Sequence, residues 1–200
     1  KAIQTLGLSA TAAGIGLDAL ARSQQTLSAN TRDMAADLGW TEDQMRALVV
    51  ATADVTMSVG DTIEVMDQAY RQGLRSADQI KEYATYWDDV ATASGESAPA
   101  LAAASASLNA VGISAENVTD SAKALGYIIE NTTGSVGEFL GFIGRTAPEL
   151  NKLEISIEDV AAMLGALEDK GIKGRTAITV VREAIEEATR TTDDYTQAIK

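Results

Sequence analysis

The acidic side chains are the first candidates for chemistry, because a pair of carboxylates can act as general acid and base. Adjacent acids occur three times, at Asp88 and Asp89, Glu186 and Glu187, and Asp193 and Asp194. Neighbouring residues of a helix point in different directions, so such neighbours do not form a catalytic pair by themselves. We interpret them as solvated faces of helices.

The residue types that serve most catalytic and metal sites are missing from this sequence. There is no cysteine and no histidine, which excludes disulfide bonds, the usual zinc sites, and Ser-His or Cys-His catalytic pairs. The stretch from Lys170 to Thr176 faintly suggests a phosphate-binding loop, but it lacks the Gly-Lys-Ser/Thr ending and no strand precedes it. We predict a protein that is not an enzyme and binds no cofactor and no metal.

The charge of the chain indicates which kinds of partner it can bind. The formal net charge is −13, and no quarter of the chain is net basic. Affinity for a nucleic-acid backbone comes from clustered lysine and arginine, so we predict no direct binding to DNA or RNA. We interpret the acidic surface as one that limits association, and an acidic docking face is the alternative.

Signals for helix starts and stops divide the sequence into short segments. Thr41, Ser76 and Ser135 each stand three residues before Gln or Glu, which is the capping-box pattern, and Ser114 and Ser156 are weaker versions. Apolar residues recur at helical spacing between these signals. The expected stops are Gly39, Gly73, Gly112, Gly134 and the segment 150–154. Helices are expected at 9–38, 42–57, 59–72, 77–94, 98–111, 115–132, 136–146, 157–170 and 175–190, with another beginning near Asp193.

This pattern predicts an all-α fold, an irregular bundle of about eight to ten short helices. We expect residues 1–38 to form a helical extension, 39–190 a helical domain, and 191–200 the start of a following helix. The stops at 39, 73 and 112 raise the alternative of a helical solenoid, but the segments between them share no sequence signature. Gly137, Gly141 and Gly144 indicate close helix packing within the fold, with a self-association or membrane-seeking patch as the alternative.

Five strings in a fixed order carry a resemblance to a known family. They are ADVTMS at 53–58, YRQGL at 70–74, LNAVGISAE at 108–116, FLGFIGRTAP at 139–148 and LGALEDKGIKGRTA at 164–177. Across 34–190 the sequence thereby resembles the helical core region of phage tail tape measure proteins, which is described as a minor tail protein domain. The positions that the resemblance marks as structural are Gly73, Gly112, Gly144, Pro148, Gly171, Ile172, Lys173 and Gly174.

The resemblance implies a long helical protein that lies in the tail tube lumen, sets tail length and is ejected at infection. It implies a stay in the host cytoplasm during assembly, and partners among tail tube, tail tip and assembly chaperone proteins, with self-association of the full-length chain. It implies no catalytic residues. The second hypothesis is a membrane-active helical module that assists genome delivery after ejection, with a membrane as a less favoured partner.

Overall fold

The computed structural model describes residues 29–53 and 56–198, and within these ranges every regular element is a helix. The predicted all-α bundle of short helices is therefore confirmed. In chain order, with η for a 3₁₀ helix, the elements are α2 (Ala29–Asp37), α3 (Glu42–Thr52), α4 (Val59–Arg71), α5 (Ala77–Ser94), α6 (Ala98–Ala104), η2 (Ser105–Val111), η3 (Ala115–Ser121), α7 (Ala122–Asn131), α8 (Val136–Leu153), α9 (Ile157–Asp169) and α10 (Gly174–Ala198).

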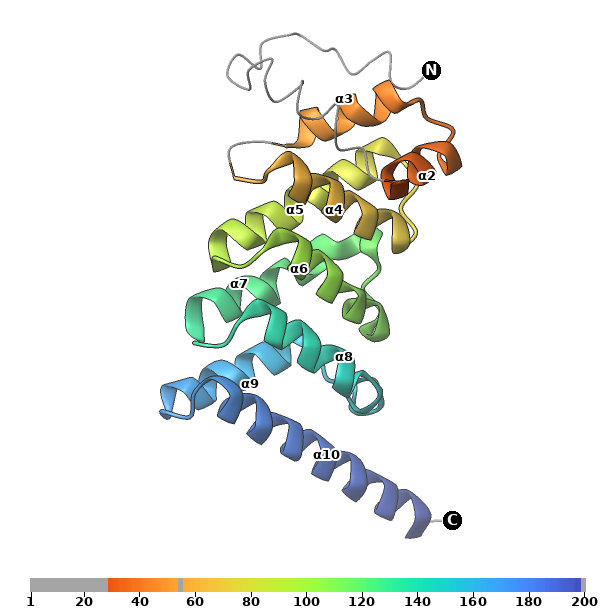
Figure 1. Cartoon of the computed structure of the whole chain (residues 1–200). Helices are drawn as coiled ribbons and strands as arrows, with labels where there is room; N and C mark the ends of the chain where they lie inside the picture. The colour runs from red at the N-terminus through yellow and green to blue at the C-terminus, as the bar shows by residue number, and fades with distance from the viewer. Residues whose placement is uncertain (1–28, 54–55, 199–200) are drawn as a thin grey trace.

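The helices are stacked in two rows, as Figure 1 shows. One row consists of α4, α6, α8 and α10, each packed against the next, and the other row consists of α5, α7 and α9. The principal contacts thus link each helix to those that follow it closely along the chain. The bundle is layered; Gly73 ends α4, and Gly112 ends η2, which continues directly from α6.

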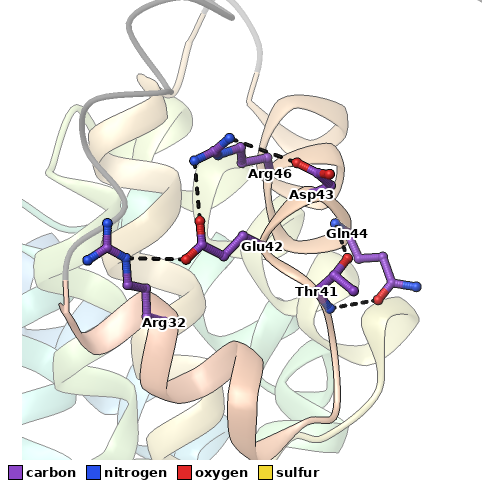
Figure 2. Close-up of polar contacts among 6 residues, drawn as sticks. All are labelled: Arg32, Thr41, Glu42, Asp43, Gln44 and Arg46. Atoms are coloured by element: carbon purple, nitrogen blue, oxygen red, sulfur yellow. Dashed lines mark hydrogen bonds and ion pairs between the residues drawn. The ribbon is translucent and has the colours of Figure 1, made fainter.

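Hydroxyl caps fix the starts of α3, α4, α5, α8 and α9. At α3, the Thr41 hydroxyl accepts from the Gln44 N–H at 3.2 Å, and the Gln44 side chain accepts from the Thr41 N–H at 2.8 Å (Figure 2). Beside this cap, Glu42 lies between Arg32 of α2 and Arg46, 3.5 Å from each. The predicted caps at Ser76, Ser135 and Ser156 also form, but Ser114 makes no cap hydrogen bond because its helix begins as a 3₁₀ turn.

A common turn ends five of the helices. At the end of α4, the Gly73 N–H donates to the Tyr70 carbonyl at 3.0 Å and the Leu74 N–H donates to the Ala69 carbonyl at 3.1 Å. Such a turn requires positive φ, here +101° at Gly73. The same bonding pattern recurs at Gly39, Gly73, Gly112, Glu154 and Gly171. The stops predicted at 39, 73, 112 and 150–154 are confirmed. The stop predicted at Gly134 is wrong, because α7 already ends at Asn131 and the extended Thr132 follows it.

Several predicted helices have different bounds in the structure. The helix expected at 42–57 ends at Thr52, and those expected at 98–111 and 115–132 each divide into an α-helix and a 3₁₀ helix. The helix expected to end at residue 146 continues through Pro148 to Leu153, because its buried face continues at Ala147 and Leu150. No new helix begins near Asp193, since α10 runs unbroken to Ala198 and the Thr192 hydroxyl donates to the Ala188 carbonyl within it. Of the helix expected at 9–38, only α2 lies among the described residues.

One continuous core runs through the stack. It is built mainly from aliphatic and small side chains, and its largest fully buried members are Trp87, Tyr83, Phe139 and Phe142. Trp87 meets Tyr83 and Tyr86 edge-on, with ring centroids 6.2 and 5.1 Å apart. These four aromatic side chains, from α5 and α8, therefore fill the centre of the layers, whereas Tyr127 and Tyr195 are exposed.

Candidate functional site

The turn between α9 and α10 contains four of the positions that the sequence marks as structural. Gly171 has φ +84° and its N–H donates to the Glu168 carbonyl at 2.9 Å, while the Ile172 N–H donates to the Leu167 carbonyl at 2.9 Å. Ile172 is half-buried against the core, and Gly174 begins α10 with φ +53°. This turn closes α9 and leads directly into α10.

The Glu168 carboxylate joins this turn to the preceding layer. It accepts hydrogen bonds from the Thr133 N–H at 3.1 Å, the Thr133 hydroxyl at 2.9 Å and the Gly174 N–H at 2.9 Å. Desolvation raises the pKa of Glu168, but the hydrogen bonds from Gly174 and Thr133, together with the Lys173 charge, lower that pKa below its usual value. Lys173 thus has an electrostatic role beside Glu168. We call Glu168 a clasp, meaning a carboxylate that joins two layers by accepting hydrogen bonds from backbone N–H groups.

Glu96 is a second clasp of the same kind, one layer earlier. Its carboxylate accepts from the Val136 N–H at 2.6 Å and the Gly137 N–H at 3.1 Å. The Ser135 hydroxyl also accepts from the Glu138 N–H at 3.0 Å. The start of α8 is therefore capped twice, by Ser135 directly before it and by Glu96 from the loop before α6. A Cβ atom at Gly137 would stand only 3.1 Å from Glu96, so the small residue leaves space for this carboxylate.

Gly144 lies where α8 crosses η2. A Cβ atom at this position would stand 2.7 Å from the Cβ of Ser107, closer than real Cβ atoms approach one another. The Asn151 side chain adds a hydrogen bond of 2.8 Å to the Ala110 carbonyl across the same crossing. The close packing predicted within the fold is confirmed at Gly144. Pro148 is exposed on the same helix.

The positions marked in the sequence do not form one site. Gly73 and Gly112 end α4 and η2, whereas Gly171, Ile172 and Lys173 connect α9 to α10, which begins at Gly174. Glu168 links this turn to the loop before α8. Sequence reasoning missed the two clasps. The sequence signal for Glu168 is its place in the last turn of α9. A negative charge there interacts unfavourably with the helix dipole, so a different interaction is expected to hold the carboxylate.

A buried polar network joins three elements near the middle of the stack. The Gln72 side chain donates to the Tyr83 hydroxyl at 2.7 Å and to the Ala102 carbonyl at 3.1 Å, and the Tyr83 hydroxyl lies 2.8 Å from the Ser105 hydroxyl. Burial raises the pKa of Tyr83 to about 12, although hydrogen bonds with Ser105 and Gln72 oppose the shift. The tyrosine therefore serves this network as a neutral hydroxyl.

Acidic residues do gather at one shallow hollow of about 360 Å³ beside the loop before α6. Asp61, Asp88 and Glu96 line it, but each is held by hydrogen bonds: Asp61 by Ser58, Asp88 by Thr56, and Glu96 by the start of α8. In the described part of the chain, no group of three or more acidic, histidine or cysteine residues is placed to hold a metal ion. The geometry assigns these carboxylates to capping and clasping.

Residues 42–200 match the family described as phage-related minor tail protein, and the chain belongs to this family. It is thereby a virion-associated tail component that interacts with other tail components. No curated protein and no solved structure matches the chain.

Proposed function

We propose that this chain is a structural module of a tape measure protein that acts in tail assembly and length determination and is ejected at infection. The observation that supports the proposal is the family match. The matched residues form a stack of capped helices whose layers are joined by Glu96 and Glu168. In this proposal the module has no catalytic activity, lies in the tail tube lumen of the virion, and passes through the host cytoplasm during assembly. Its partners are tail tube, tail tip or chaperone proteins and further copies of the full-length chain.

The test is an in-frame deletion of residues 39–190 from the full-length protein, with tail length measured by electron microscopy. As one continuous helix, these residues would span roughly 230 Å at about 1.5 Å per residue. As a compact unit they would have a radius of gyration of about 15 Å. We expect the deletion to shorten tails by far less than the extended length, or to block assembly. Viable particles shortened by nearly the full extended length would contradict a folded module in the virion.

The second candidate function is a membrane-active module that assists genome delivery. In the described part of the chain, no single helix has the length and hydropathy to span a membrane, but Ala98–Val111 and Ala115–Asn131 meet that test together across a 90° bend. Here Leu101, Leu108, Leu125 and Ile128 are buried in the core, so this pair also meets the description of ordinary core helices. Leakage from liposomes on addition of the chain at neutral pH would favour the membrane function, and intact liposomes would count against it.

A further inference from the structure

The helices in the row of α4, α6, α8 and α10 all pack against one another, but the surfaces over their contacts differ. Between η2 and α8, Gly144 lets the backbones approach directly. Between α8 and α10, Glu138 pairs with Arg175 at 2.8 Å, and Lys152 pairs with Asp193. Between α4 and α6 there is instead a groove of about 570 Å³.

We call the α6 side of this α4–α6 groove, with its small uncharged side chains, the floor, and the α4 side, with Glu64 and Asp67, the acidic wall. The groove lining consists of Ile63, Glu64, Asp67 and Gln68 from α4 and Ser97, Pro99, Ala100 and Ala103 from α6 and the residue before it. The α6 side is uncharged, because the sequence from 97 to 115 contains no acidic or basic residue. The groove therefore presents negative charge along one wall only.

The charge on that wall is incompletely compensated. Asp67 pairs with Arg71 of its own helix at 2.7 Å. Glu64 is exposed, and among the described residues no side chain forms a hydrogen bond or an ion pair with its carboxylate. A cationic group of a partner would therefore meet a carboxylate that no internal partner has neutralised.

We propose that the α4–α6 groove receives an amphipathic helix of a partner protein, with apolar side chains on the floor and a lysine or arginine against Glu64. A helix fits because the trough lies between two helices and the alanines of α6 permit close approach. The self-association proposed for the full-length chain would use another surface, because the net charge of −13 on each copy opposes docking of a second copy against this acidic wall. The proposal rests on a role in the tail, but not on length determination.

The test uses a fluorescent synthetic helix of about 18 residues with leucine and alanine on one face and lysines flanking it. Binding to the full chain is measured by anisotropy at about 150 mM salt. We expect saturable binding that weakens about tenfold when the flanking lysines are replaced by glutamate. Glu64→Lys on the acidic wall and Ala103→Arg on the floor should each weaken binding by a similar factor. Both positions are exposed, so melting curves should show folded variants.

The matched control is Glu130→Lys, which makes the same change in net charge at an exposed position of α7, in the other row. It should leave the affinity nearly unchanged. Equal weakening by Glu64→Lys and Glu130→Lys would show attraction to net charge alone and overturn the proposal. Binding that survives Ala103→Arg would overturn it too, as would a dimer of the chain that Ala103→Arg dissociates. Tail length enters none of these outcomes, so failure here is distinct from failure of the tape measure function.

Discussion

The junctions around α8 and the junction between α2 and α3 both use charged side chains, but they differ in what those charges meet. Glu96 and Glu168 are half-buried carboxylates that accept backbone N–H groups from another layer. Glu42 pairs with Arg32 and Arg46 over an open surface, and its side chain is 52% exposed (Figure 2). A carboxylate that satisfies otherwise unpaired backbone donors contributes more than an exposed ion pair, which water and salt weaken.

The largest loss of stability is expected from Gly144→Val at the crossing of α8 and η2. The new side chain would collide with Ser107, so the two elements must move apart, at a cost of about 2–3 kcal/mol. For a chain of this size that lowers the melting temperature by about 4–12 °C in a calorimetric scan. The control is Gly126→Val on α7, where the added atoms meet open space. Equal losses for both variants would mean that valine disfavours the helix generally and that the crossing is not tight.

The next largest loss is expected from Glu168→Ala, which removes the acceptor of the Thr133 and Gly174 donors. Water can reach part of this site, so the expected cost is about 1–2 kcal/mol in denaturant unfolding at pH 7. Hydrogen exchange should rise at the loop before α8 and at the first turn of α10. An unchanged exchange rate at both places would contradict the clasp.

The stability supplied by Glu168 should also depend on pH. Its folded pKa is lowered, so the stabilisation is fully present above the unfolded pKa of about 4.3 and is lost as the pH falls through the lower folded pKa. The difference between wild type and Glu168→Ala should therefore be constant near neutral pH and shrink below about pH 4. A difference that persists unchanged at pH 2 would assign the effect to packing.

A smaller loss is expected from Gly171→Val in the turn after α9. A Cβ atom there would meet no other atom, so the cost of about 1 kcal/mol or more comes from the positive φ alone. The measurement is the melting temperature, with Gly171→Asn as a comparison because asparagine tolerates this conformation better. No difference among glycine, asparagine and valine would show that the turn is not needed in this form.

The sequence was informative wherever a signal is local. The segment expected at 77–94 coincides with α5, because Ser76 caps its start and the apolar spacing continues through Trp87 to Val90. The contacts that join layers were not predictable in this way. Glu96 meets Val136, and Gly144 meets Ser107, across long stretches of chain that carry no local pattern. The helix expected to end at residue 146 was predicted too short, because its buried face continues past Pro148 to Leu150.

The smallest effect is expected from Glu42→Gln at the junction of α2 and α3. The substitution removes the charge that faces Arg32 and Arg46, but it keeps the shape and the Thr41–Gln44 cap. Both ion pairs are 3.5 Å long and open to solvent, so we expect a loss of about 0–0.5 kcal/mol in denaturant unfolding at low salt. At about 1 M salt even this loss should vanish, because screening removes what the exposed charges contribute. If Glu42→Gln instead cost as much as Glu168→Ala, and did so at both salt concentrations, solvent exposure would not distinguish the two junctions. The shared factor would then be the capping of helix starts, since Glu42 lies in the first turn of α3 and Glu168 reaches the first turn of α10.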